Sequence, residues 1–241
     1  MIAEFVGLPG CGKSAVSHAV AERLRGEHLQ VSERSFELAH RMGATRRRLA
    51  KLRLAGRVGL KRPRAALSLM REIARCGQQS WLEGIAKTLD LLAICGLVTE
   101  LARRPGIHIL DQGFFSGLWS IGFRASSDLA LARLVEIGVT CCGRSPADLV
   151  IALEVEPATA ARRLRNRPGA ASRLQARLDA GATNPAMQRD LQAAVRSLRR
   201  VRELLSAPEA GWRLRVASNE EAGATDLRAA EIAAGIRSAM E

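Results

Sequence analysis

Gly7-Leu8-Pro9-Gly10-Cys11-Gly12-Lys13-Ser14 is the stretch that decides the fold of this chain. It matches Gly-x4-Gly-Lys-[Ser/Thr], a pattern whose backbone N–H groups can curl around a chain of phosphates. The apolar run Ile2–Val6 precedes it, and residues 15–25 carry apolar side chains at the spacing of an amphipathic helix. A strand, this loop and a helix in that order predict a phosphate-binding loop backed by the positive end of the helix.

The loop residues have distinct predicted roles. Its glycines let the backbone turn inward, Lys13 supplies a mobile charge for the β and γ phosphates, and Ser14 supplies a hydroxyl for Mg²⁺. Lys13 is one of only four lysines among 37 basic residues. We therefore predict ATP and Mg²⁺ as cofactors; the alternative is a plain glycine-rich turn. The predicted nucleotide contacts in the loop are Gly7, Pro9, Gly10, Cys11, Gly12, Lys13, Ser14 and Ala15.

Size and composition indicate a single α/β domain over residues 1–241, with insertions. Hydrophobic residues make up 47% of the chain and its mean hydropathy is −0.02. We see no charged-then-apolar leader, and the apolar stretch 85–98 is interrupted by Lys87 and Asp90 and is too short to span a bilayer. The five cysteines form no Cys-x-x-Cys pair, which argues against structural zinc and a disulfide framework. We expect a cytoplasmic protein without a transmembrane segment.

The net charge of +13 is concentrated in one place. Residues 41–75 hold twelve basic side chains against Glu72 alone, which predicts a basic helical insertion at about 41–80. This block could cover an anionic substrate, bind nucleic acid, lie on a membrane surface, or be the solvated side of amphipathic helices. Nucleic acid is the less favoured partner, because the 3% aromatic content gives few side chains for base stacking.

Acidic residues follow two of the predicted strands. Residues 29–32 read as a short strand, and Glu33 at its carboxyl end is a candidate to accept a proton from an acceptor hydroxyl, with Glu37 as the substitute. The strand Gly106–Leu110 ends in Asp111, which we predict beside the Mg²⁺ held by Ser14. The alternatives are a solvated Glu33 and an Asp111 that caps the next helix.

An aromatic segment and an arginine-rich segment complete the predicted acceptor side. Residues 112–124 contain four of the eight aromatics, which either wall an acceptor pocket or belong to the core. Residues 162–173 contain five arginines and no acid, and Pro168-Gly169 interrupts their helix. We predict a hinged lid at about 158–182, the alternative being a basic surface helix. The lid arginines predicted to contact the transferred phosphoryl group are Arg163, Arg167 and Arg173.

The last two strands read clearly as well. The near-continuous apolar run 148–155 is typical of a parallel sheet covered on both faces. Residues 212–216 read as the final strand, and Asn219 in the loop after it is predicted near the adenine of the nucleotide.

With these residues in view, the chain resembles the P-loop nucleoside and nucleotide kinases, and thymidylate kinases are the nearest relatives we can name. The phosphate loop is one match, and Glu154-Val155-Glu156-Pro157 entering an arginine-bearing helix is another. Asp111 with Ser116 and Gly122 has the spacing of that family's segment after the third strand. The resemblance implies a P-loop NTPase fold: a three-layer α/β/α sandwich around a five-stranded parallel sheet of order 2-3-1-4-5.

Three departures concern the acceptor. Gln112 stands where the family has an arginine for the acceptor's monophosphate, Ile121 where it has a thymine-reading glutamine, and Glu33-Arg34 lacks the usual proline. We therefore expect an ATP- and Mg²⁺-dependent phosphotransferase acting on a different small acceptor, a nucleoside, nucleotide or other hydroxyl-bearing molecule. The rival is a P-loop ATPase or switch whose basic segment binds nucleic acid or an anionic membrane. The sequence leaves two questions open: whether the phosphoryl donor is ATP or GTP, and whether the protein forms a homodimer.

Overall fold

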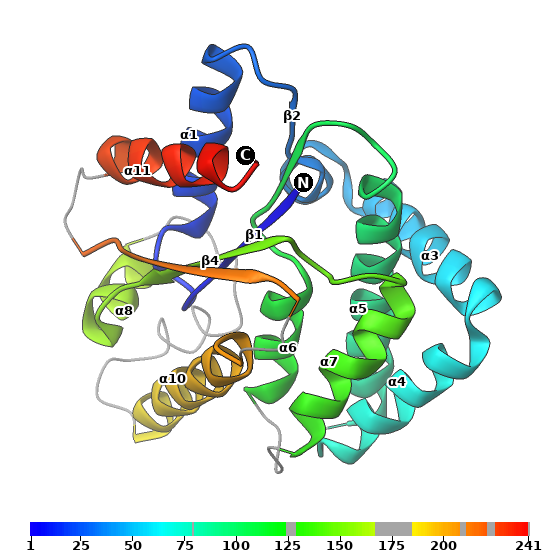
Figure 1. The fold of residues 1–241 in the computed structure, drawn as a ribbon. Helices are drawn as coiled ribbons and strands as arrows, with labels where there is room; N and C mark the ends of the chain where they lie inside the picture. Colours follow the sequence, from blue (N-terminus) through cyan, green and yellow to red (C-terminus); the bar gives the residue numbers. More distant parts are fainter. Residues whose placement is uncertain (79, 124–128, 167–184, 208–210, 221–224, 241) are drawn as a thin grey trace.

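Five parallel strands form one sheet at the centre of the molecule in the computed structural model (Figure 1), which describes residues 1–78, 80–123, 129–166, 185–207, 211–220 and 225–240. The strands are β1 (Ile2–Val6), β2 (Val31–Ser32), β3 (Ile107–Leu110), β4 (Leu149–Glu154) and β5 (Arg213–Ser218). Their order is β2-β3-β1-β4-β5, so the predicted order 2-3-1-4-5 is confirmed.

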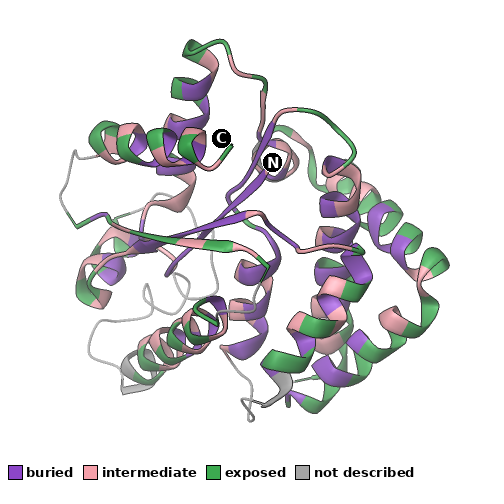
Figure 2. Ribbon diagram, in the orientation of Figure 1, coloured by how far each residue is buried: buried purple, intermediate pink, exposed green. Residues whose placement is uncertain are grey.

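The central strand β1 shows how the sheet is covered on both faces. Every residue of β1 is buried, and its side chains alternate between two apolar clusters. Ala3 and Phe5 pack in the cluster with α1 (Lys13–Gly26) and α11 (Thr225–Ser238), whereas Ile2 and Val6 pack in the other. Figure 2 shows the central strands as almost entirely buried. This two-sided burial explains why the strands read as continuous apolar runs.

The opposite face of the sheet is covered by a larger group of helices (Figure 1). These helices are α3 (Ala44–Lys61), α4 (Pro63–Arg75), α5 (Trp81–Leu101), α6 (Phe114–Gly122), α7 (Leu129–Cys142) and α10 (Pro185–Leu205). Two short segments, α2 (Arg34–Phe36) and the π-helical turn η1 (Glu37–Arg41), follow β2, and α8 (Pro157–Arg165) follows β4. Helices on both faces of the sheet give the three-layer α/β/α fold that the sequence predicted.

The register places the loops after β1, β3 and β4 at one edge of the sheet. Glu4 pairs with Leu110, the last residue of β3, and Val6 pairs with Ala152 near the end of β4. The loop after β1 therefore lies between the segments that follow β3 and β4. This carboxyl edge is where ligands bind in open parallel sheets.

The basic block differs in one respect from the sequence-based expectation. Glycine and proline predict helix breaks at Gly43, Gly56, Gly59, Pro63 and Gly77-Gln78. The breaks at Gly43, Pro63 and Gly77 are present, but α3 continues through Gly56 and Gly59. A helical glycine costs only about 1 kcal/mol. The burial of Leu54, Ala55 and Val58 on the inner side of α3 offsets that cost.

All five cysteines are buried, and each is a free thiol. Across the described ranges, no helix is both long enough and apolar enough to cross a membrane.

Candidate active site

The phosphate loop joins the carboxyl end of β1 to the first residue of α1. Gly10 and Gly12 adopt φ angles of 87° and 89°, which side-chain-bearing residues rarely adopt. A Cβ on Gly10 would lie 2.4 Å from the Ala160 carbonyl oxygen, and one on Gly12 would lie 2.7 Å from the Asn219 amide nitrogen. The loop therefore needs glycine at these positions both for its turn and for its close neighbours.

The side chain of Lys13, the first residue of α1, folds back over the phosphate loop. Its Nζ donates hydrogen bonds to the carbonyl oxygens of Gly7 at 2.7 Å and Leu8 at 3.0 Å. No side chain caps the first turn of α1 at Gly12, so that end of the helix presents backbone N–H groups. A charge and a set of N–H donors at one helix end form a site for a polyphosphate anion.

Asp111 lies at the end of β3, directly beside the loop. The Ser14 hydroxyl donates to Asp111 Oδ2 at 3.3 Å, and the Ser35 hydroxyl donates to Asp111 Oδ1 at 2.7 Å. The Asp111 backbone N–H donates back to Ser35 Oγ at 3.2 Å. The structure thus brings together Ser14 and Asp111, the two predicted metal contacts. A hydroxyl and a carboxylate are oxygen donors of the kind that Mg²⁺ accepts alongside phosphate and water.

Ser35 was not predicted as a site residue. It lies three residues beyond β2 and is buried, and the sequence around it carries no motif. Its hydroxyl donates to the Asp111 carboxylate and accepts from the Asp111 backbone N–H, and this pair of bonds holds the carboxylate in one orientation.

The last strand also reaches the phosphate loop. Asn219, predicted near the adenine, donates from Nδ2 to the Cys11 carbonyl oxygen at 2.7 Å, while its backbone N–H donates to Glu154 at 2.8 Å. Arg163 donates to the carbonyl oxygens of Asn219 at 2.8 Å and Glu220 at 2.9 Å. The loop after β5 is thereby fastened both to the phosphate loop and to α8. Of the predicted lid at 158–182, Arg167 and Arg173 lie outside the described residues.

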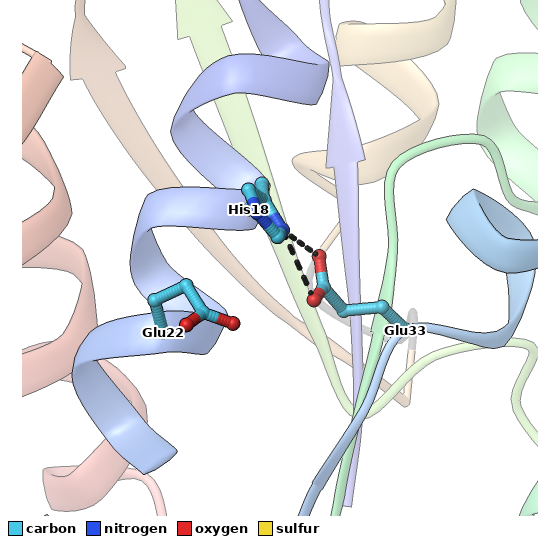
Figure 3. A group of neighbouring side chains, drawn as sticks. All are labelled: His18, Glu22 and Glu33. Atoms are coloured by element: carbon cyan, nitrogen blue, oxygen red, sulfur yellow. Dashed lines mark hydrogen bonds and ion pairs between the residues drawn. The ribbon is translucent and has the colours of Figure 1, made fainter. Parts of the chain in front are cut away.

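Glu33 lies away from the phosphate loop, between β2 and α1. Its buried carboxylate contacts Arg25 NH1 at 2.8 Å and His18 Nδ1 at 3.1 Å, and Figure 3 shows it turned toward His18. The side chains of His18, Glu22 and Glu33 lie close enough to one another to ligate a metal ion. However, the Arg25 guanidinium pairs with both carboxylates, so their charge is already compensated. The substitute candidate Glu37 pairs with Arg34 at 3.0 Å. Neither glutamate lines the cavity described next.

A cavity of about 840 Å³ opens from the phosphate loop and runs along α6 between α3 and α5. Five basic side chains line its described part, against one carboxylate. They are Lys13, Arg47, Lys51, Lys87 and Arg163, and the carboxylate is Asp90. Lys51 pairs with Asp90 at 2.7 Å, and Lys87 donates to the Ser120 hydroxyl. The cavity therefore offers basic and hydrogen-bonding groups at several points of a largely apolar lining, which suits a ligand that carries both anionic and apolar parts.

Three of the four lysines of the chain line this one cavity. Lys51 and Lys87 were not among the predicted site residues, although the rarity of lysine in an arginine-rich chain was a usable signal. A lysine ammonium is compact and mobile, whereas a guanidinium is a rigid planar fork.

The aromatic side chains of residues 112–124 divide between the hydrophobic core and the wall of the cavity. Phe114 and Phe115 are fully buried, and Phe115 packs edge-on against Trp212 at 4.8 Å between ring centroids. Trp119 lines the cavity, stacks on Phe123 at 5.8 Å, and donates from its indole nitrogen to the Ala194 carbonyl oxygen at 3.0 Å. Only Trp119 of these residues is placed to contact an acceptor.

Glu4 is a buried carboxyl group directly beneath the site. It extends from β1 to the start of α6, where the Ser116 backbone N–H donates to Oε1 at 2.8 Å, while Oε2 has no hydrogen-bond partner. Burial raises the pKa of the Glu4 carboxyl from its ordinary value of 4.5 to about 7, and the N–H groups of α6 oppose part of that rise.

Stability should therefore fall as pH rises from about 4.5 to 7. In that window the folded chain keeps a proton on Glu4 that the unfolded chain has released, and the loss above pH 7 amounts to about 3 kcal/mol. We expect the Glu4→Gln variant to lack this component of the pH dependence. Urea unfolding of both proteins at pH 5 and pH 8 measures it; parallel pH profiles would show that Glu4 is ionised in the folded protein.

The sheet order and the loop after its first strand are those of a P-loop fold. Solved structures of deoxyadenosine kinase from M. mycoides share it over the full length of the chain. The form with bound dATP gives a TM-score of 0.56 at 12% identity over 98% of this chain and 100% of that one. The form with products dCMP and a flexible dCDP gives 0.53 at 12% identity over 99% of both chains, and the dCTP form gives 0.51 at 11% over 99% of this chain and 100% of that one. At such identity the likeness concerns the fold. Neither a protein-family model nor a curated protein sequence matches the chain.

Proposed function

We propose that this protein is a kinase that transfers the γ-phosphoryl group of ATP, with Mg²⁺, to a small nucleoside, nucleotide or other hydroxyl-bearing acceptor. The observation that carries the proposal is the cavity of about 840 Å³ that starts at the phosphate loop and continues along α6. A hydrolase or switch needs room for the triphosphate and a water molecule only. Here the space continues well beyond the loop, and its lining combines apolar side chains, Trp119 among them, with lysine, arginine, serine and aspartate side chains.

The donor end of the site would hold the triphosphate and the metal. Lys13 and the N–H groups at the start of α1 would bind the β and γ phosphates, and Ser14 with Asp111 would hold Mg²⁺. Bound Mg²⁺ would neutralise charge on the phosphates as the bond to the leaving oxygen breaks. Arg163 lines the same cavity and would contact the transferred group. Arg167 and Arg173 stay predicted partners of that group.

The acceptor end would lie between α3, α5 and the distal half of α6. Gly113 to Ser120 spans about 10 Å at the rise of an α-helix, which is the length of a sugar joined to a base or to a second ring. Trp119 offers a stacking surface, and Lys51, Asp90 and Lys87 offer donors and an acceptor. The nucleotides bound by the deoxyadenosine kinase structures support an acceptor of nucleoside type.

Proton acceptance by Glu33 is kept as part of the proposal, and it requires the carboxylate to leave Arg25 and His18 when the acceptor binds. In that case Glu33→Gln lowers turnover by about 10²-fold or more while ATP affinity is kept. Steady-state kinetics and calorimetric ATP binding measure the two effects. Unchanged turnover together with a lower unfolding temperature would instead assign Glu33 to the ion pairs that join β2 to α1.

The acceptor can be found by ligand-induced stabilisation. Nucleosides, nucleotides, sugars and aminocyclitols are screened by thermal shift with Mg²⁺ and a non-hydrolysable ATP analogue, since a ligand that binds the folded state raises its unfolding temperature. Compounds that raise the unfolding temperature are then tested for acceptor-dependent ADP release. A protein that hydrolyses ATP at the same rate with and without each of these compounds would support the rival ATPase.

A further inference from the structure

The exposed apolar side chains of this protein gather in one region. Among the described residues, nine of the twelve large apolar side chains that are exposed lie between Leu49 and Leu89. The apolar patch, as we define it, consists of Leu60, Leu67, Met70, Trp81, Ile85 and Leu89. Leu60 is 87% exposed and Trp81 72% exposed. Single exposed apolar side chains are ordinary, whereas apolar side chains gathered in one patch mark interaction surfaces.

The patch has a defined shape. Leu67 and Met70 of α4 face Ile85 and Leu89 of α5 across a groove of about 430 Å³, and Leu60 lies at the end of α3 beside it. The groove has almost no polar surface in its lining. Figure 2 shows the outer sides of α3 and α4 as largely exposed. These three helices therefore present a continuous apolar strip to the outside.

Basic side chains lie beside this strip on α3 and α4. Arg64, Leu67 and Arg71 follow one another at i, i+3 and i+7 on α4, and all three are exposed on one side of that helix. Lys61, next to Leu60, is exposed as well. Within the part of the chain that the structure describes, the side chains of Lys61, Arg64 and Arg71 have neither a hydrogen bond nor an ion pair.

Few acidic side chains lie in the same region. On α5, Glu83 and Asp90 lie among the apolar positions, and Asp90 is paired with Lys51 at 2.7 Å. Glu72 is the only other acid between residues 41 and 90. It is buried, and it pairs with Arg75 at 2.6 Å. The surface around the patch therefore carries an excess of positive charge with exposed apolar groups set among it.

We propose that this surface of α3, α4 and α5 binds the face of an anionic phospholipid bilayer. Leu60, Trp81 and the side chains of the groove would enter the headgroup and upper acyl region, while Lys61, Arg64 and Arg71 contact lipid phosphates. An indole ring suits this depth because one edge is apolar and the other donates a hydrogen bond. The binding is peripheral and reversible, and it does not depend on the proposed function.

Charge decides against the two other occupants of such a surface. A second copy of the chain would place the same unpaired cations against each other across an apolar contact. Nucleic acid would satisfy the cations but leave the apolar strip without a matching surface. An anionic bilayer offers both complementary charges and an apolar interior.

Vesicle co-sedimentation of the full chain tests the proposal. We expect binding to vesicles of phosphatidylcholine mixed with phosphatidylglycerol, at least tenfold weaker binding to phosphatidylcholine alone, and weakening as salt is raised. Emission from Trp81 should shift to shorter wavelength on binding. The shift should be lost in Trp81→Phe, because Trp119 and Trp212 are hydrogen-bonded inside the protein.

Surface variants with matched controls locate the binding face. The double variants Leu60→Ser/Leu67→Ser and Arg64→Gln/Arg71→Gln should each weaken partitioning about tenfold or more. Two control variants should leave partitioning unchanged. They are Leu227→Ser on α11, where the leucine is 58% exposed, and Arg103→Gln, just beyond the C-terminal end of α5. All substituted side chains are exposed, so circular dichroism should show the same fold.

Several outcomes would overturn the proposal. These are no binding to anionic vesicles at low salt, and equal binding by the patch variants and their controls. A dimer in sedimentation equilibrium that the patch variants dissociate, without vesicle binding, would assign the surface to a second copy. Salt-dependent binding of DNA or RNA without vesicle binding would assign it to nucleic acid.

Discussion

The Lys13→Ala variant is expected to lose acceptor-dependent ADP release, with kcat/KM lower by about 10²- to 10³-fold. The Lys13 ammonium lies against the carbonyl oxygens of Gly7 and Leu8, at the point where the terminal phosphates would enter the loop. Removing it leaves the charge that develops during transfer without its nearest cation. Initial rates with the acceptor found by thermal shift, at saturating ATP, measure the loss.

Lys61 supplies the matched control for this experiment. It is the one lysine of the four that does not line the described cavity, so Lys61→Ala should turn over at the wild-type rate in an assay without membranes. Lys13→Arg should also be strongly impaired, because a planar guanidinium cannot occupy the position of a compact ammonium inside a tight loop. Wild-type turnover by Lys13→Ala would remove the phosphate loop from the mechanism.

The Asp111→Asn variant is expected to fold but to lose its normal response to Mg²⁺. Asparagine can keep the hydrogen bond from Ser35, whereas the negative charge beside Ser14 is gone. We expect turnover to fall by about 10²-fold or more and half-maximal activity to require at least tenfold more Mg²⁺.

Activity measured against Mg²⁺ concentration tests this prediction. Ser35→Ala is the comparison variant, because it keeps the carboxylate but frees its orientation, so a smaller change in the same direction is expected. A Mg²⁺ dependence identical to that of the wild type in Asp111→Asn would place the metal elsewhere.

The strands near the sheet centre were predictable from the sequence, but their order was not predictable from periodicity. β1, β3 and β4 read as apolar runs because both faces of each strand are buried. β2 has only two residues, too few for a periodic signal, and it lies within the strand predicted at residues 29–32. The order 2-3-1-4-5 came from the resemblance to P-loop kinases, and the strand pairing confirms it.

The site was predictable where it follows directly from a strand end. Ser14 and Asp111 lie together because parallel strands bring their carboxyl ends to one edge. The acceptor side was harder to predict from the sequence. Lys51 on α3 and Lys87 on α5 are 36 residues apart in the sequence, and only the packing of these helices brings both to the same cavity. Glu33 illustrates the converse: it follows a strand, yet Arg25 and His18 on α1 hold its side chain away from the cavity.

The hydrogen bond from Asn219 to the Cys11 carbonyl joins residues 208 positions apart. A ribosome releases the phosphate loop long before Asn219, so the emerging chain cannot close this contact until β5 has been made. The central strand β1 likewise waits for β3 and β4 before it has neighbours, which favours slow folding. The nascent polypeptide is thus expected not to bind ATP until β5 and Asn219 have emerged.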